Sequence, residues 1–527
     1  MAVMLAIWFI IALVLTLYYL STKTFNYWKK KKVPYHKPVP LFGNYAKHIQ
    51  MRQHAGKICQ KLCAEFRDEP YFGTFYGTDP ALVILDPEVI KLVLIKDFYY
   101  FNSRGAMHYN DSEMLMQNLF FSHGDKWKIA RQNLTPLFSS AKMKNMFYLI
   151  QRCAYIFEDM LEYETGISDV IEAKTLMIRY TMDCICSCAF GINANTQTRD
   201  AEKNIFTIMG HNIFGHSYKR AFTTIARSVW PEIFYMLGMK SFSISVNAFF
   251  YNLLTGVFES RQNKPSPRND FVDLVLSWKT NKHLVGESIS NMKTGGFTKI
   301  KQEVDNELLV SQCVIFFAAG FETSASVLSL TIYELAKNQE VQRRAQKEVD
   351  EYLLRHRNKL TYDCVKELPY INACVAETSR LYPALGILTR QAVEDYTFPC
   401  GLHLERGSRV HLPIYYLHHN ADNFLEPEEY KPERFLPGAK HEIKQFTYFP
   451  FGEGPRTCIG TRFAKMQITP GLIAFLKKYS VELAEGTPST LEFDPSFMQI
   501  IATTPLRLKV TLRSGWEDRV FVRESSG

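Results

Sequence analysis

The chain has 527 residues and a formal net charge of +9, with 46% hydrophobic and 22% charged residues. This composition excludes an intrinsically disordered chain and a protein of many membrane spans, and it favours a large globular body. The modest positive charge suits an anionic membrane surface or an acidic protein partner. The sequence has no zinc-finger spacing and no long arginine-rich run, so we expect no nucleic acid partner.

The first twenty residues carry no charged side chain and are dominated by aliphatic and aromatic residues. About twenty such residues are enough to cross a bilayer as a helix. We expect residues 1–22 to be a transmembrane signal anchor. A cleaved signal peptide is the alternative, but no basic stretch precedes the apolar run. Tyr27 and Trp28 would then lie at the membrane interface, and the lysines at 29–32 would hold the following chain on the cytosolic side.

Residues 23–43 are basic at first and then rich in proline, with Pro34, Pro38 and Pro40 close together. Proline cannot continue a helix, so this composition predicts a stiff extended linker. We place a domain boundary after it and assign residues 44–527 to one large globular domain.

Strand patterns come first in this domain. Residues 71–76 and 81–85 predict two strands joined by a turn over residues 77–80. Asp86 and Pro87 indicate a helix start, and helical patterns then dominate to about residue 260. Residues 221–250 are unusually apolar and aromatic. They are either helix core or a second surface patch that dips into the membrane.

Polar loops are expected at 264–270 and 281–301, followed by a long helix over 305–336. Charged and apolar residues alternate at helical spacing over 340–354, and another helix over 368–381 is stopped by a proline. Short strands and loops follow. The pattern predicts a mainly α domain with a small β region. An open parallel α/β sheet fits poorly, because the strands do not alternate with helices.

The eleven cysteines are odd in number and irregularly spaced, which argues against a secreted disulfide framework. Cys184, Cys186 and Cys188 resemble a metal cluster. No second cysteine and histidine group of matching spacing accompanies them, and their surroundings are apolar. Core packing is therefore the preferred interpretation.

The strongest motif runs from Phe451 to Gly460 and resembles the haem-binding loop of the cytochrome P450 family. The five positions of the family pattern are filled by Phe451, Gly454, Arg456, Cys458 and Gly460. Glycines allow tight turns and close approach, and a thiolate ligand pushes electron density onto iron and favours O–O cleavage. The resemblance implies that Cys458 ligates the iron of haem b, iron protoporphyrin IX. The alternative is a buried cysteine in a glycine-rich turn.

A second motif, Ala319 to Ser324, lies inside the predicted long helix. Glycine within a helix costs roughly 1 kcal/mol relative to alanine, so Gly320 needs a reason. In related monooxygenases the corresponding glycine makes room over the iron, and the following acid and threonine relay protons. The resemblance assigns that relay to Glu322 and Thr323. A kinked helix with solvated polar residues is the alternative.

Charged residues complete the resemblance. Glu377 and Arg380 lie three residues apart on one helix face and, with Arg434, match a buried structural network of the family. The haem propionates need cationic or polar donors, and arginine offers a fork of them. Family positions assign this role to Trp127, Arg131, Arg390, Arg104 and Arg456, although each arginine by itself is more often a surface charge.

The resemblance extends from Pro34 onward, and it is closest to microsomal insect enzymes that oxidise plant toxins and insecticides. It implies a monooxygenase of the endoplasmic reticulum membrane, with its catalytic domain on the cytosolic side, that acts with O2 on small apolar substrates. No glycine-rich dinucleotide fingerprint is present. Electrons would therefore come from NADPH-dependent cytochrome P450 reductase, with cytochrome b5 as a further candidate partner. Basic residues that would meet an acidic partner are Lys126, Lys128, Lys142, Lys144 and Lys465.

The pocket walls implied by the resemblance are 104–121, part of 205–215, 316–319, 384–388 and 497–503. They are rich in apolar residues, which suits an apolar substrate. Three alternatives stay open: oxidation of an endogenous lipid or hormone by the same chemistry, a peroxide isomerase, and a haem-binding protein without turnover. Thr323 argues against the isomerase, since such family members commonly lack it.

Overall fold

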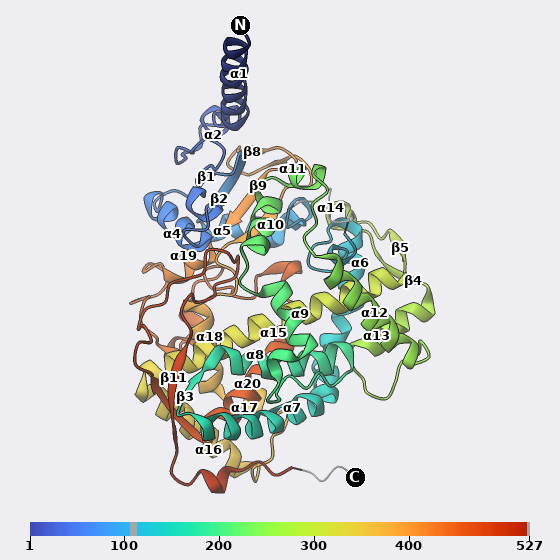
Figure 1. Ribbon diagram of the computed structural model, residues 1–527, viewed down its shortest axis with the longest axis vertical. Coiled ribbons are helices and arrows are strands. Elements are labelled where there is room, and N and C mark those ends of the chain that lie inside the picture. The colour runs from blue at the N-terminus through green and yellow to red at the C-terminus, as the bar shows by residue number, and fades with distance from the viewer. Residues whose placement is uncertain (106–112, 524–527) are drawn as a thin grey trace.

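The computed structural model describes residues 1–105 and 113–523, and helices make up most of it (Figure 1). The helices of its first half are α1 (Ala2–Thr22), α2 (Tyr27–Lys30), α3 (Ala46–Ile49), α4 (Ala55–Glu65), α5 (Pro87–Lys91), α6 (Gly124–Leu134), α7 (Ser140–Ile167), α8 (Ala173–Ile185), α9 (Ile205–Phe214), α10 (Tyr218–Val229), α11 (Pro231–Met236) and α12 (Ile244–Ser260). Those of the second half are α13 (Phe271–Asn281), α14 (Asn291–Thr294), α15 (Asn306–Lys337), α16 (Gln339–Arg355), α17 (Cys364–Glu367), α18 (Pro369–Leu381), α19 (Ile414–His419) and α20 (Thr461–Leu476).

The strands are short and gather in small sheets. They are β1 (Tyr71–Tyr76), β2 (Asp79–Ile84), β3 (Val170–Glu172), β4 (His283–Glu287), β5 (Lys299–Glu303), β6 (Leu388–Gln391), β7 (Tyr396–Thr397), β8 (His403–Leu404), β9 (Arg409–Leu412), β10 (Tyr479–Leu483) and β11 (Arg507–Leu512). A mixed sheet has the order β1-β2-β9-β6 with β2 and β9 parallel, a second has the order β10-β11-β3, and β4-β5 and β7-β8 are pairs. The predicted mainly α domain with a small β region is confirmed.

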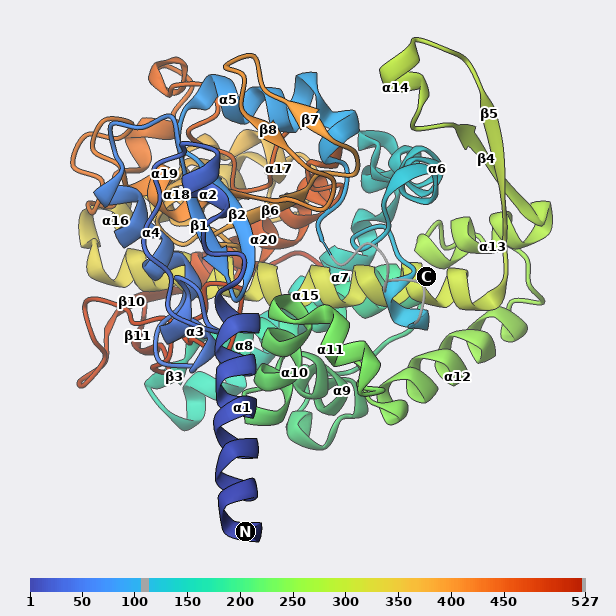
Figure 2. The ribbon, with the colours of Figure 1, turned by 90° about the horizontal axis from the view of Figure 1, so that it is seen from above.

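Helix α15 crosses the middle of the body, and the other long helices pack around it (Figures 1 and 2). It begins where the Asp305 carboxylate accepts the backbone N–H of Leu308 at 2.7 Å, which is a helix N-cap. It is apolar enough to cross a membrane, but 61% of its most apolar 18-residue stretch is buried in the body. Helix α15 is therefore the central core helix.

Helix α1 projects from one end of the body (Figure 1), and none of its most apolar 18-residue stretch is buried. The helix has 21 residues, and the mean hydropathy of this stretch is 2.5. A helix of this length and composition is suited to span a bilayer, as the sequence predicted for residues 1–22.

The segment after α1 packs on the body and does not form a free linker. Trp28 is 1% exposed, and its indole N–H donates to the carbonyl of Thr74 on β1 at 2.9 Å. Lys31 forms an ion pair with Glu405 at 2.7 Å. The prediction that Trp28 lies at the membrane interface is wrong, because β1 encloses its ring. The expected linker over residues 23–43 is part of the folded body from Trp28 onward.

Residues 281–301 are not the polar loop that their composition predicted. Strands β4 and β5 pair antiparallel there, with His283 opposite Glu303 and Glu287 opposite Lys299. The hairpin lies along α6, where the Asp125 carboxylate accepts the backbone N–H of Ile289 at 2.6 Å. Pairing across the hairpin satisfies the backbone, so the polar side chains are free to face solvent.

The apolar segment 221–250 divides between the two expected roles. Phe234 and Phe250 are buried in the core, whereas Phe222, Ile233, Met236 and Leu237 are more than half exposed. The exposed residues belong to α10, α11 and the turn after it. Figures 1 and 2 place these helices at the end of the body from which α1 projects.

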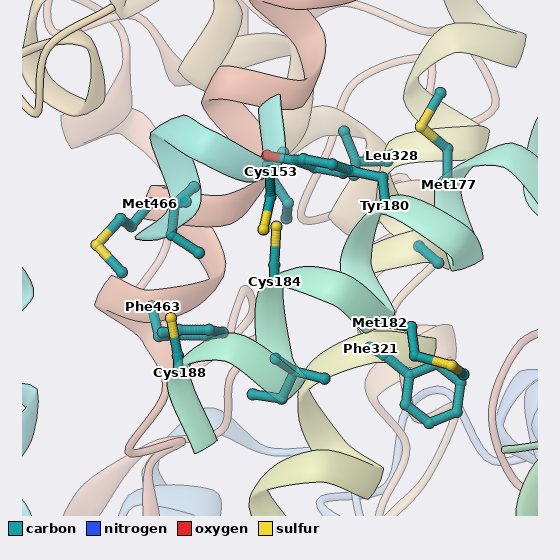
Figure 3. Packing of buried hydrophobic residues seen from close by; sticks show 14 of the residues in the cluster. Cys153, Met177, Tyr180, Met182, Cys184, Cys188, Phe321, Leu328, Phe463 and Met466 are labelled. Atoms are coloured by element: carbon teal, nitrogen blue, oxygen red, sulfur yellow. The ribbon is translucent and has the colours of Figure 1, made fainter. Parts of the chain in front are cut away.

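The cysteine run at the end of α8 belongs to the hydrophobic core. Cys184, Cys186 and Cys188 are each 0% exposed, and the thiols of Cys184 and Cys153 point toward one another among apolar side chains (Figure 3). Burial raises the pKa of all three thiols in the run well above the usual value. They are therefore protonated and pack as small apolar groups.

We predict that Gly73→Ala loosens the attachment of the anchor segment. A methyl group at Gly73 would overlap the Trp28 ring, so the variant must displace the indole at a cost of about 1–3 kcal/mol. Thermal unfolding should occur at a lower temperature, and trypsin should cut faster at the lysines at 29–32. Gly438→Ala is the matched control, since its methyl group enters open space. Equal behaviour of the two variants would contradict the prediction.

Candidate functional site

The loop that carries Cys458 is held by its own backbone. The N–H of Cys458 donates to the carbonyl of Phe451 at 2.8 Å, and the Thr457 hydroxyl donates to the carbonyl of Gly452 at 3.1 Å. Gly454 has a φ of +73°, and a side chain there would overlap the Leu94 carbonyl oxygen. Only glycine fits such a turn against a neighbouring backbone. The loop ends at Gly460, which caps the start of α20.

Cys458 is one of two exposed cysteines, although it lies deep in the fold. Burial raises the pKa of its thiol, whereas the backbone N–H of Gly460 and the charges of Arg104 and Arg131 lower it. The thiol therefore sits just before a helix N-terminus and beside cationic groups, which are the surroundings that favour a reactive or ligating thiolate.

Four arginines from separate parts of the chain surround this loop. Arg104 follows the short helix over 98–101, Arg131 lies on α6, Arg390 on β6, and Arg456 within the loop itself. Arg131 donates to the carbonyl of Thr457 at 2.8 Å, and Arg104 donates to the carbonyl of Arg456 at 3.3 Å. The structure thus brings all four predicted arginines to one place.

The positive charge of this arginine cluster is not balanced by the protein. Arg390 and Arg456 are 1% and 2% exposed, and no carboxylate pairs with any of the four among residues 1–105 and 113–523. Burial and, to a smaller extent, the neighbouring charge of Arg104 lower the pKa of Arg390 to about 9. Burial likewise lowers the pKa of Arg104 to about 10. Buried like charges are costly, so the cluster requires an anionic group.

Unpaired donors point to the same requirement. The Nε atoms of Arg104, Arg390 and Arg456 are buried and have no hydrogen-bond partner. The Trp127 ring packs under the guanidinium of Arg456, with 4.7 Å between the ring centroid and Cζ. A ligand with two carboxylates, lying next to the Cys458 thiol, would satisfy these donors.

One face of α15 borders the same site. Ala319 is exposed and Thr323 is half-buried, although most residues around them on α15 are buried. The Thr323 hydroxyl donates to the carbonyl of Ala319 at 2.6 Å, one helical turn earlier. Its oxygen therefore keeps lone pairs that can accept a proton or a hydrogen bond.

Glu322 points away from that face, toward α8. Its Oε1 lies 2.8 Å from Nζ of Lys174, and the carboxylate is 4% exposed. The contact is an ion pair by distance, but its angles do not make a hydrogen bond, so Oε1 remains without one. Glu322 and Thr323 thus adjoin in sequence but face different surroundings. Sequence reasoning missed Lys174, because no motif marks its position on α8.

Gly320 lies where α15 packs closely against α8. A side chain at this position would place its Cβ 2.5 Å from Cδ1 of Ile185 on α8. The glycine therefore allows α8 and α15 to pack closely, and the room that it makes is between these helices. The expected role of clearing space over a metal stays a prediction.

The structure joins Glu377, Arg380 and Arg434 in one buried network. Both Arg380 and Glu377 are 0% exposed, and two parallel hydrogen bonds of 2.8 Å link them. Arg380 also donates to the carbonyls of His418 and Pro427, and Arg434 Nε donates to Glu377 at 3.3 Å. Here, unlike in the arginine cluster, the protein supplies every partner that the buried charges need.

Some expected site residues lie elsewhere. Phe316 is buried against Phe271, with ring centroids 4.7 Å apart, and belongs to the core instead of a pocket wall. Lys128 forms an ion pair with Glu287 on β4 at 3.3 Å, so it is less available to a partner than expected. Residues 106–112 of the first expected wall lie outside the described part of the chain.

Comparison with known proteins identifies the family of the chain. The family model for cytochrome P450 matches residues 33–512. Cytochrome P450 6j1 of Blattella germanica is 33% identical over 503 residues, which cover 95% of this chain and 96% of that protein. Cytochrome P450 6B2 of Helicoverpa armigera is 34% identical over 502 residues, covering 95% and 97%. Cytochrome P450 6a2 of Drosophila melanogaster is 33% identical over 512 residues, covering 94% and 97%.

We predict that Glu377→Gln is strongly destabilising. The change removes the charge that balances two buried or half-buried arginines, and breaking such a pair costs about 3–5 kcal/mol. The free energy of unfolding, measured by denaturant titration, should fall by that amount. Glu340→Gln breaks the exposed pair with Arg343, so its effect should stay below about 1 kcal/mol. A small effect of Glu377→Gln would show that the network is dispensable.

Proposed function

Because the chain belongs to the cytochrome P450 family of monooxygenases, we propose that it oxidises small apolar foreign compounds at the Cys458 site, with electrons from an NADPH-dependent reductase. The single observation that carries the site assignment is the arginine cluster, whose buried Nε donors lack partners, beside the exposed Cys458. Iron protoporphyrin IX matches this arrangement, since it offers a metal for the thiolate and two propionates for the arginines.

Each residue of the site has a definite task in this proposal. The Cys458 thiolate would ligate the iron, and Arg104, Arg131, Arg390 and Arg456 would hold the propionates, with Trp127 packed beneath Arg456. When bound, the haem supplies the activation of O2. The turn at Gly454 and the hydrogen bond from the Cys458 N–H to Phe451 hold the loop that carries the sulfur, just before the start of α20.

The chain's own residues then handle protons. The Thr323 hydroxyl faces the site, with its hydrogen donated to Ala319 and its lone pairs available. Glu322 lies one residue earlier, paired with Lys174 on the far side of the helix. We assign Glu322 the uptake of protons from the α8 side and Thr323 their delivery at the site face. A rotation of the Glu322 side chain would link the two.

Apolar side chains bound the site on the substrate side. Phe120 and Phe121 are half-buried with ring centroids 4.9 Å apart, and the Ala319 face of α15 is free of charge. Such walls favour apolar and aromatic compounds. The similarity to insect relatives supports plant toxins and insecticides as the substrate class, with oxidation of an endogenous lipid or hormone as the alternative.

A basic face lies next to the Cys458 loop. Lys126, Lys142, Lys144 and Lys465 are exposed, and a hollow is bordered by Arg131, Ser139 and Arg462. This face suits the acidic surface of an electron-donating protein, for which we propose NADPH-dependent cytochrome P450 reductase and, as a further candidate, cytochrome b5.

Two apolar surfaces at one end of the body suit a membrane. Helix α1 is long enough to span it, and Phe222, Ile233, Met236 and Leu237 expose apolar side chains at the same end (Figure 1). We propose that the protein resides in the endoplasmic reticulum membrane, with the body on the cytosolic side next to the lysines at 29–32.

The reduced protein treated with carbon monoxide should show the red-shifted absorption typical of thiolate-ligated haem. Cys458→Ser should abolish that absorption, because serine supplies no thiolate. Cys400→Ser is the matched control, since Cys400 is the other exposed cysteine and should leave the spectrum unchanged. A histidine-type spectrum, or no haem uptake by the folded protein, would refute the site assignment.

Arg390→Gln should weaken haem retention without changing the thiolate spectrum. Losing one charge-assisted hydrogen bond to a propionate lowers affinity by about tenfold or more. The rate of haem transfer to excess apomyoglobin measures this effect. Arg406→Gln changes an exposed arginine and should match the original protein. Equal transfer rates for both variants would argue against propionate binding by the cluster.

The substrate class is tested by turnover of the full-length protein with reductase and NADPH. Insecticides and plant toxins form one panel, and fatty acids and steroids form the other, with products identified by mass spectrometry. Oxidation confined to the first panel supports the proposal. Oxidation confined to the second would establish the endogenous alternative.

A further inference from the structure

Strands β4 and β5, with α14 between them, form an arm that stands at the side of the body (Figure 2). The base of the arm is closed by the backbone N–H of Val304, which donates to the carbonyl of Lys282 at 3.0 Å. At the tip, the Asn291 side chain donates to the carbonyl of Thr298 at 2.9 Å and accepts the N–H of Thr298 at 3.1 Å. The arm, residues 282–304, is therefore closed at both ends and behaves as one unit.

The arm is bonded along one face of α6. The Asp125 carboxylate accepts the backbone N–H of Ile289 at 2.6 Å, and the Gln132 side chain accepts the backbone N–H of Glu287 at 2.9 Å. Gln132 directly follows Arg131, one of the four arginines beside the Cys458 loop. The arm is thus fixed to the helix that carries one member of the arginine cluster.

Gly286 allows the arm to lie directly against α6. A side chain at this position would place its Cβ 2.7 Å from Oε1 of Gln132 and 3.1 Å from Cγ1 of Ile129. Neither distance leaves room for a methyl group at its ordinary van der Waals separation. Any larger residue at position 286 must therefore move the arm and α6 apart.

The arm is attached at a second place through Lys293 on α14. The Lys293 ammonium forms an ion pair of 2.6 Å with Glu394 and lies 5.1 Å from the centroid of the Tyr99 ring. The Tyr99 hydroxyl donates to the same Glu394 carboxylate at 2.5 Å. One lysine of the arm therefore contacts two residues that are distant from each other in the sequence.

Tyr99 and Glu394 lie at one end of two segments that run side by side. We call residues 99–104 and 389–394 together the paired segment. Backbone hydrogen bonds join its two halves, at 2.8 Å from Val393 to Tyr100 and at 2.9 Å from Gln391 to Ser103. The paired segment contains Arg104 in one half and Arg390 in the other, so the arm is fixed to the carriers of two further cluster arginines.

The arginines that these contacts bring together carry like charges. Burial lowers the pKa of both Arg104 and Arg390, and the charge of a neighbouring arginine adds to the effect in each. Repulsion between the guanidinium groups favours separation of α6 from the paired segment. The arm is bonded to α6 at Gln132 and to the paired segment at Glu394, so it opposes that separation.

We propose that the β4–β5 arm is an external clamp on the arginine cluster, which holds the segments of Arg104, Arg131 and Arg390 together and thereby determines how firmly the site retains its cofactor. Gly286 and Lys293 are positioning residues, because they act on the arginines through α6 and the paired segment. The proposal rests on the proposed function in that the anionic cofactor is haem.

The clamp is tested by the rate at which haem passes from the full-length protein to excess apomyoglobin. Gly286→Ala should raise that rate about tenfold, because the added methyl group must part the arm from α6. Lys293→Met removes the half-exposed pair with Glu394 and should raise it by a smaller factor, about twofold. In both variants the absorption of the reduced protein with carbon monoxide should keep its wavelength, since Cys458 is unaltered.

A matched glycine variant separates the clamp from a general loss of stability. Gly73→Ala also forces a methyl group into a packed contact, but at the Trp28 ring in the segment after α1. Both Gly73→Ala and Gly286→Ala should lower the temperature of thermal unfolding, whereas only Gly286→Ala should speed haem transfer. Unchanged haem transfer in Gly286→Ala, or an equal rise in Gly73→Ala, would overturn the proposal.

Hydrogen exchange tests the hold of the arm by a readout other than haem transfer. The backbone N–H groups of Glu287 and Ile289 are bonded to side chains of α6, so both amides should be protected in the original protein and exchange faster in Gly286→Ala. Rapid exchange of both amides in the original protein would contradict the clamp. A protein that takes up no haem fails the proposed function on its spectrum, while the exchange result still decides whether the arm holds α6.

Discussion

Positive charge confined beside a thiol is the constraint on which this structure depends. Four guanidinium groups converge on the Cys458 loop from four different elements, and within the described residues the protein offers them carbonyl oxygens but no carboxylate. Such an arrangement is unfavourable for the protein alone and becomes favourable when an anionic ligand enters. The convergence of α6, β6, the segment near Arg104 and the loop is therefore best understood as a receptor for a charged cofactor.

The same side chain serves the opposite purpose a short distance along the chain. Arg380 is as deeply buried as Arg390, yet Glu377 and three backbone carbonyls satisfy it completely. That network ties α18 to the segment before the Cys458 loop and completes itself during folding. One set of arginines thus stabilises the fold, and the other set has no carboxylate partner among the described residues.

The end of the body near the anchor is coupled to the site through packing. Trp28 fastens the chain after α1 to β1, and the turn after β1 contacts Val229 at the end of α10. Helices α10 and α11 expose Phe222, Ile233 and Met236. They are followed by a turn in which the backbone N–H of Ser241 donates to the Glu113 carboxylate. Contacts with a membrane at this end would therefore act on the same helices that cover the site.

The sequence by itself determined the local parts of this protein. The Cys458 loop closes through a hydrogen bond from Cys458 to Phe451, and Glu377 and Arg380 meet because they lie three residues apart on a helix. Helix α15 follows from a long helical pattern with few breaks. Each of these features is set by a few neighbouring residues. The tertiary structure decided what depends on distant partners: the burial of Trp28 against β1, the hairpin of β4 and β5 against α6, the reason for Gly320, and the pairing of Glu322 with Lys174. These contacts leave no periodicity or spacing in the sequence, because the two partners are brought together only when the helices and sheets pack.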